Sequence, residues 1–157
     1  MNNKSLAGYK KLAVLIFLFI VVTLFRNYAF DIVTVSGNSM NDFYFQGDVL
    51  IAKADTSDIE RFDVVVAQVE GQKIIKRVIA LPGETIHIQN GKVYINGEEV
   101  IGAFALNTDD AGIAKEPYIL GKDEYFLMGD NRSQSYDSRN FGGVNIKEIE
   151  SVVMFKI

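Results

Sequence analysis

The chain of 157 residues contains no cysteine and only one histidine, His87. The lack of cysteine excludes disulfides, thiolate metal sites and cysteine nucleophiles, and a single histidine excludes a histidine-rich metal centre. We therefore expect no metal and no cofactor. The formal net charge is −4, and residues 31–157 carry 12 basic and 20 acidic residues without a basic cluster. This balance argues against nucleic acid as a partner.

The first 30 residues contain no acidic residue and carry a long apolar run. Fourteen residues from Leu12 to Phe25 are apolar except for Thr23, and the run reaches nineteen at Phe30. A membrane-spanning helix needs about 20 residues, whereas a cleavable signal peptide has a shorter apolar core. Arg26 lies where small residues would mark a cleavage site, so we favour an uncleaved anchor. Residues 1–30 are then a cytoplasmic tail and transmembrane helix.

After residue 30 the pattern is typical of short strands with period-two alternation. The expected strands cover residues 31–36, 48–52, 62–69, 73–81, 85–89, 93–95, 124–128 and 151–157. Glu70-Gly71, Asn90-Gly91 and Asn96-Gly97 are expected to form tight hairpin turns. The one short helix expected beyond the anchor is 145–150. The sequence thus predicts a mainly β fold, with a single domain at 31–157 outside the membrane.

The segment Gln72–Leu81 places Lys76 in an almost wholly apolar run. Burial there lowers the pKa of a lysine amine, and a neutral amine can act as general base toward a serine hydroxyl. Ser39, which follows the glycine turn Ser36-Gly37-Asn38, is the candidate nucleophile, because such a serine is exposed with its own N–H free for an oxyanion. The alternatives remain open that Lys76 faces solvent and that the glycine–serine segment is a plain turn.

A third block, Gly129–Gly142, is a polar loop between short strands that contains two arginines, two aspartates and three serines. A plain solvated turn would explain it, but its composition favours a loop ordered by internal hydrogen bonds. A Ser-His-Asp mechanism is the natural rival to a serine–lysine pair, and it would need His87. In Ile86-His87-Ile88 the histidine faces opposite its two neighbours, which favours the solvent side.

Together these blocks resemble a type I signal peptidase, the membrane-bound serine–lysine endopeptidase that removes signal peptides from exported proteins. The resemblance rests on Lys76-Arg77 followed by Pro82-Gly83-Glu84 and on Gly129-Asp130-Asn131-Arg132 followed by Ser135, Asp137-Ser138-Arg139 and Phe141-Gly142. It covers nearly the whole chain, and the length is similar to that of the compact Gram-positive form. It implies a compact β-sheet or barrel-like domain of the signal-peptidase type behind one transmembrane helix.

The resemblance implies a role for each matching residue. Ser39 matches the nucleophile, Lys76 the general base and Ser135 the serine that orients the lysine amine. Asp137 and Arg139 match a pair that braces the active-site loop. Gly37 stands where Gram-negative members place a second oxyanion hydroxyl. Shallow pockets for small residues at substrate positions −1 and −3 are implied at Val33, Val35, Met40, Val66 and Ile75.

The chain departs from the family pattern just after Ser39, where Asp42 replaces a usual proline and Phe43 a usual threonine. The aromatic run 43–45 is interpreted either as core filling or as a contact with the membrane interface. The implied partners are the lipid bilayer and the signal peptides of exported preproteins. Because some signal-peptidase-like proteins serve in pilus assembly, an accessory role with weak or no proteolysis, and pilins as partners, is the alternative. A self-cleaving repressor peptidase is opposed by the anchor and the missing DNA-binding domain.

Overall fold

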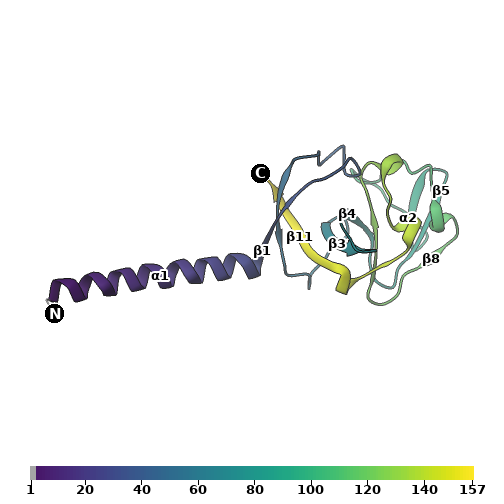
Figure 1. The fold of residues 1–157 in the computed structure, drawn as a ribbon. Coiled ribbons are helices and arrows are strands. Elements are labelled where there is room, and N and C mark those ends of the chain that lie inside the picture. The colour runs from purple at the N-terminus through teal and green to yellow at the C-terminus, as the bar shows by residue number, and fades with distance from the viewer. Residues whose placement is uncertain (1–2) are drawn as a thin grey trace.

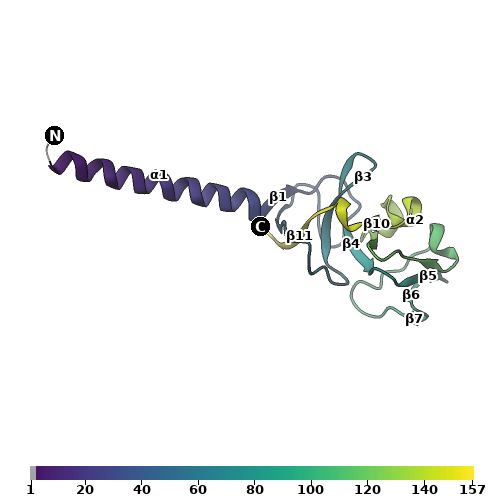
Figure 2. The ribbon, with the colours of Figure 1, turned by 90° about the horizontal axis from the view of Figure 1, so that it is seen from below.

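The structure is a computed structural model that describes the backbone of residues 3–157 and the side chains of residues 10–23 and 30–157. Helix α1 (Asn3–Ala29) projects away from the β-strands, which form a separate compact body (Figures 1 and 2). Within the described part of the chain, no helix has the length and apolar character needed to cross a membrane. The side chains of Lys4 and Arg26, at the ends of the predicted anchor, lie outside the described residues.

Seven strands form the larger sheet, in the order β1-β2-β11-β3-β4-β9-β10. They are β1 (Phe30–Thr34), β2 (Val49–Lys53), β3 (Val64–Val69), β4 (Gln72–Ala80), β9 (Glu124–Met128), β10 (Val144–Asn145) and β11 (Ile149–Lys156). All neighbours pair antiparallel. Since β1 and β4 are separated by an even number of antiparallel steps, these two strands run parallel to each other.

A smaller sheet has the order β7-β6-β5-β8 and lies on the side of the body away from α1 (Figures 1 and 2). Its strands are β5 (Thr85–Gln89), β6 (Lys92–Ile95), β7 (Glu98–Glu99) and β8 (Tyr118–Ile119). One-turn elements connect the strands: η1 (Gly112–Lys115), η2 (Arg132–Gln134), α2 (Ser138–Phe141) and η3 (Ile146–Glu148). The expectation of a mainly β fold is confirmed.

The three expected hairpin turns are present, and their backbone angles explain the residues used. Glu70, Asn90 and Asn96 have φ of 51°, 52° and 52°, and each is followed by a glycine with positive φ. Two successive residues with φ > 0 define the turn whose twist matches that of the flanking strands. These turns fix the register of β3 with β4, β5 with β6 and β6 with β7.

The short helix expected at 145–150 is wrong in extent, because only 146–148 form a single 3₁₀ turn. The side chains of Asn145 and Glu148 cap this turn reciprocally. Ile149 then enters β11, where it pairs with Ala67 and is buried. Burial of an apolar residue in the sheet therefore ends the helix after one turn.

Two apolar clusters support the sheets. One joins β4 and β9 to the smaller sheet through residues such as Ile79, Ile86 and Phe126. The other covers the opposite face of β3, β4 and β9, where it includes Val65 and Leu127. Because β4 contributes to both clusters, its central residues are buried on both faces, and this burial extends to Lys76 and Arg77.

Candidate active site

The structure brings Ser39 and Lys76 into contact although 37 positions separate them in the sequence. The Lys76 Nζ atom lies 2.7 Å from the Ser39 Oγ atom. Lys76 projects from β4 and is only 4% exposed. Ser39 lies in the turn after β1. Gly37, in the same turn, has a φ of 86°, which residues with a Cβ rarely adopt. The solvent-facing alternative for Lys76 is thus excluded by its burial.

Burial is the largest influence on the amine, and it lowers the pKa of Lys76 below the ordinary lysine value. The charges of Asp137 and Asp130 oppose this shift, whereas the charge of Arg139 adds to it. An amine whose pKa is lowered gives up its own proton more readily, and once neutral it can accept the proton of the hydroxyl that it contacts. The geometry and the direction of the shift therefore agree with a base beside a nucleophile.

Backbone contacts from the loop after β9 hold the turn that carries Ser39. The Asn131 N–H donates to the Ser39 carbonyl oxygen at 3.0 Å, and the Asn131 side-chain amide donates to the Asn38 carbonyl at 3.1 Å. Gly129 lies against the same turn, since a Cβ built there would overlap the Ser39 carbonyl oxygen and the Ser135 hydroxyl. Asn131 and Gly129 were not singled out individually from the sequence, although both lie in the third block.

Asp137 and Arg139 form a buried ion pair that orders this loop. The Arg139 Nε and Nη2 atoms donate to the two Asp137 carboxylate oxygens at 2.8 and 2.9 Å, and both side chains are at most 2% exposed. Asp137 also accepts from the Gly129 N–H at 3.0 Å. Arg139 donates further to the carbonyls of Arg132 and Ser135. The loop is therefore internally hydrogen-bonded, as its composition indicated, and is not a plain solvated turn.

Ser135 lies near Ser39 but does not make the expected contact with the Lys76 amine. Its Oγ atom is buried and has no hydrogen-bond partner within the described part of the chain. A Cβ built at Gly129 would overlap both this hydroxyl and the Ser39 carbonyl oxygen, so these two groups lie close together. No hydrogen bond joins Ser135 to Lys76 in the described structure, so its orienting role stays a prediction.

Arg77, next to Lys76, forms a second buried ion pair, with Asp130. The Nε and Nη2 atoms of Arg77 donate to Asp130 at 2.7 and 2.6 Å, with side chains 5% and 0% exposed. The guanidinium also packs on Phe104, 3.8 Å from the ring centroid, and on Phe43 at 5.2 Å. Nothing in the sequence around Phe104 pointed to this contact.

The aromatic run after Ser39 does not fill the core. Phe43 packs on Phe104 and Arg77 but is itself 36% exposed, and Phe45 is 51% exposed. Asp42 has a φ of 101°, and a proline, whose ring fixes φ near about −65°, cannot adopt it. The replacement of proline by Asp42 therefore goes with a different loop conformation.

A groove of about 460 Å³ begins at Ser39 and Lys76. It is lined by residues 33–36 of the chain, by Ser39 and Met40, and by residues 72–76. The predicted pocket residues Val33, Val35, Met40 and Ile75 are among these. Val66 is not, because it lies on β3, is fully buried and only pairs with Ile75.

In the described part of the chain, no further strand pairs with the outer side of β1 at residues 31–34, or with one side of β4 at residues 72–76. β1 is the end strand of the larger sheet, and β9 pairs with β4 only from Arg77 onward. The open edges of β1 and of residues 72–76 of β4 thus lie on either side of the groove. An extended peptide can add to such an edge by main-chain hydrogen bonds.

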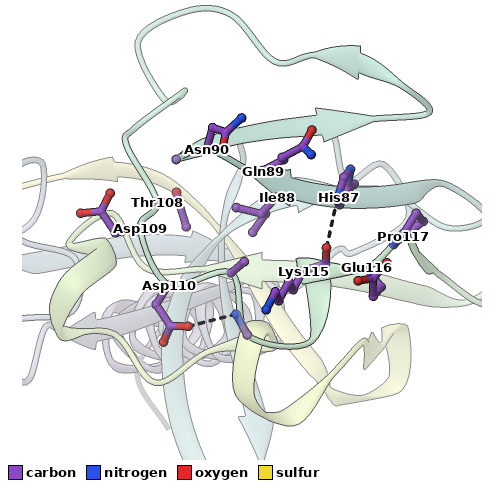
Figure 3. A pocket seen from close by; sticks show the side chains of 13 residues that line it. His87, Ile88, Gln89, Asn90, Thr108, Asp109, Asp110, Lys115, Glu116 and Pro117 are labelled. Atoms are coloured by element: carbon purple, nitrogen blue, oxygen red, sulfur yellow. Dashed lines mark hydrogen bonds between the residues drawn. The ribbon is translucent and has the colours of Figure 1, made fainter.

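A larger cavity of about 840 Å³ lies on the smaller sheet, and neither Ser39 nor Lys76 lines it (Figure 3). The His87 Nε2 atom lies 3.0 Å from the Lys115 carbonyl oxygen, which can only accept, so this nitrogen carries the proton (Figure 3). His87 is thus not placed as the base for Ser39. Among the described residues, no group of three or more histidine, aspartate or glutamate side chains is arranged to hold a metal ion.

Comparison with known proteins gives consistent results. The family model "Signal peptidase, peptidase S26" matches residues 9–157. The chain is 36% identical over 149 residues to signal peptidase I V of Bacillus subtilis, covering 82% of this chain and 86% of that protein. It is 35% identical over 144 residues to a signal peptidase I of Bacillus amyloliquefaciens, covering 82% and 76% of the two chains.

Among solved structures, a signal peptidase I from Enterococcus faecalis V583 matches with a TM-score of 0.52 and 27% identity. The match covers 64% of this chain and all of that one. The resemblance noted from the sequence motifs is confirmed, and the chain belongs to the signal peptidase family, peptidase S26.

Proposed function

We propose that this protein is a membrane-bound serine endopeptidase that removes signal peptides from exported preproteins, with Ser39 as nucleophile and Lys76 as general base. The observation that carries the proposal is the 2.7 Å contact between the Ser39 hydroxyl and the buried amine of Lys76. The names of the Bacillus relatives, signal peptidase I, support the substrate class.

In the proposed reaction the neutral Lys76 amine takes the proton of the Ser39 hydroxyl as its oxygen attacks the substrate carbonyl carbon. The backbone N–H of Ser39 is the proposed donor to the oxyanion, since Gly37 supplies no second hydroxyl. The lysine ammonium then protonates the leaving amine, which departs as the new N-terminus of the mature protein. Water, deprotonated by Lys76, hydrolyses the Ser39 ester by the same route.

The substrate is proposed to lie extended in the groove between β1 and β4. The part of the groove lined by Val33, Val35, Met40 and Ile75 is proposed to accept small side chains at −3 and −1. Val66 does not line the groove; it pairs with Ile75 on the neighbouring strand and supports it there. The substrate carbonyl after the −1 residue would then meet Ser39 where the groove reaches Lys76.

We place the β domain, residues 31–157, outside the cytoplasm and against the lipid bilayer. Residues 1–30, with α1 as the proposed anchor, carry basic residues before the apolar run, which favours a cytoplasmic N-terminus. Exposed apolar side chains of β1, β11 and the loop after Ser39 support contact with lipid, since β1 and β11 both pair with β2 and Lys156 of β11 lies over the Phe45 ring. They are Phe30, Ile32, Phe45, Met154, Phe155 and Ile157.

The test is cleavage of a preprotein by the full-length protein in detergent. We expect processing by the unaltered protein and by Ser57→Ala and Lys92→Ala, whose side chains are exposed on other parts of the body. Ser39→Ala and Lys76→Ala should abolish it. If the unaltered protein cleaves neither preproteins nor pilins, the peptidase proposal is wrong, and the accessory role in pilus assembly suggested by Asp42 and Phe43 is favoured.

A further inference from the structure

Three charged side chains from three strands meet at the end of the groove that lies away from Ser39. The Lys73 Nζ atom of β4 lies 2.8 Å from Glu150 of β11 and 3.8 Å from Asp31 of β1. All three side chains are partly open to solvent, with exposures of 48%, 40% and 39% for Lys73, Glu150 and Asp31. We call these three residues the ion cluster.

The contact between Lys73 and Asp31 spans the groove. β1 and β4 are not hydrogen-bonded to each other, because β2, β11 and β3 lie between them in the sheet. In the described structure, side chains of β4 contact β1 through Lys73 with Asp31, and the turn after β1 through Lys76 with Ser39. Along β4 these places are three residues apart, or roughly 10 Å at the rise of a β-strand.

A peptide bound as proposed above must pass the ion cluster. With its reactive carbonyl at Ser39, an extended chain advances about 3.3 Å per residue and reaches Lys73 at the fourth residue before the cleaved bond. Val33 is the groove residue of β1 that lies farthest from Ser39, and Asp31 lies two positions before it. The fifth or sixth substrate residue before the cleaved bond therefore reaches Asp31. Substrate positions −4 to −6 therefore lie beside the cluster.

We infer that the ion cluster determines substrate charge preference at positions −4 to −6, accepting a basic side chain and rejecting an acidic one. This inference rests on the proposed function of the groove. The cluster carries two carboxylates and one amine, so its net charge is −1. The amine is held close to Glu150, whereas the longer 3.8 Å contact leaves Asp31 able to pair with a substrate lysine. An acidic substrate residue would meet both carboxylates with the single amine already engaged.

The test measures binding of peptides to full-length protein carrying Ser39→Ala, in an uncharged detergent. Peptides share an alanine-rich cleavage site and differ by one lysine or one glutamate at −4, −5 or −6. Exposed ion pairs are weak, so we expect the lysine peptide to bind about twofold to fivefold more tightly at one or more of these positions. The same ratio should appear in kcat/KM for the protein that retains Ser39.

Charge reversal in the cluster gives the sharper result. Lys73→Glu should raise the preference for lysine by about fivefold, and Asp31→Lys should invert it, because the cluster then carries a positive charge. Lys92→Glu is the matched control, since it reverses a lysine in an exposed ion pair with Glu99 on the smaller sheet. The control should leave the ratio unchanged, and salt at about 1 M should reduce the ratio toward one in every variant.

Equal binding of lysine and glutamate peptides in all variants, or no binding of either, overturns the inference. The inference is also overturned if Lys92→Glu changes the ratio of lysine-peptide to glutamate-peptide binding as much as the cluster variants do. The net charge of the protein would then explain the preference. Charge-dependent binding without cleavage by the protein that retains Ser39 would support the ion cluster and refute the peptidase proposal. Cleavage with no charge preference would support the peptidase proposal and refute the role of the ion cluster.

Discussion

Gly129 provides a sharp test of how the two loops of the site are held together. It lies where a Cβ would fall closer than 3.0 Å to the Ser39 carbonyl oxygen and to the Ser135 side chain. Gly129 has little room to move away, because its N–H donates to Asp137 at 3.0 Å and its carbonyl accepts from Arg132 at 3.1 Å. Gly129→Ala therefore has to displace the turn that carries Ser39.

The size of the expected effect follows from the overlap of the new Cβ with the Ser39 carbonyl oxygen. Restoring ordinary contact distances requires the Ser39 turn to move by about 1 Å, and a displacement of that size at a reacting group lowers the rate by about 10²-fold. The added methyl group should also cost about 1–3 kcal/mol of unfolding free energy, as other overpacked sites do. We expect the loss in kcat, with a smaller change in KM, because the groove wall on β4 is not touched.

The assay is steady-state cleavage of a quenched fluorescent signal-peptide substrate by the full-length protein, with thermal unfolding followed by circular dichroism. Gly121→Ala is the matched control: the atoms nearest to its new Cβ belong to the flexible Glu124 side chain, the first at 3.1 Å, so activity should be kept. A folded Gly129→Ala protein with kcat within about twofold of the unaltered protein would refute the reasoning, since the overlap would then be relieved without moving Ser39.

Three further predictions concern Lys76, Asp42 and Asp130. Since burial lowers the pKa of Lys76, activity should rise with pH through a value below the usual ~10.4 for lysine, and a pH–rate profile that rises only near that value would contradict the base assignment. The same shift means that the unfolded chain binds more protons between the two pKa values, so stability should increase with pH across that interval. Asp42→Gly should raise the unfolding free energy by about 1 kcal/mol, because φ at this position is 101°, and a lower melting temperature would contradict this. Asp130→Asn should cost about 3 kcal/mol, since it leaves the Arg77 charge buried without its partner, whereas Glu99→Gln at an exposed pair should cost less than about 1 kcal/mol; similar losses in urea unfolding would show that burial does not matter here.

Much of the fold was predictable because it depends on local backbone chemistry. Glycine after Glu70, Asn90 and Asn96 fixes turns with positive φ, and period-two alternation marks the strands that these turns join. The boundary near Asn145 was not predictable in the same way. A capped turn and a buried strand compete there, and the outcome depends on the pairing of Ile149 with Ala67, a residue distant in the sequence.

In the candidate site, too, some features were predictable from local sequence and others depend on contacts between distant residues. The motifs around Ser39, Lys76 and Asp137 identified the family, but the expected contact of Ser135 with the amine is not made in the described structure. Packing of Phe104 on Arg77 was invisible in the sequence. This cation–π contact joins Arg77 of β4 to a loop residue distant in the sequence, so no local pattern predicts it.

By itself, the sequence determined the strand-rich class, the tight hairpins and the residue types able to perform serine–lysine chemistry, because each of these follows from nearby residues. The tertiary structure alone decided that the amine of Lys76 is buried within 2.7 Å of the Ser39 hydroxyl, and that Lys73 reaches Asp31 across the groove. Both contacts join β4 to β1 or to the turn that follows it, and these strands meet only because three others curve between them. Sheet order and burial are properties of the whole chain, and they set these distances.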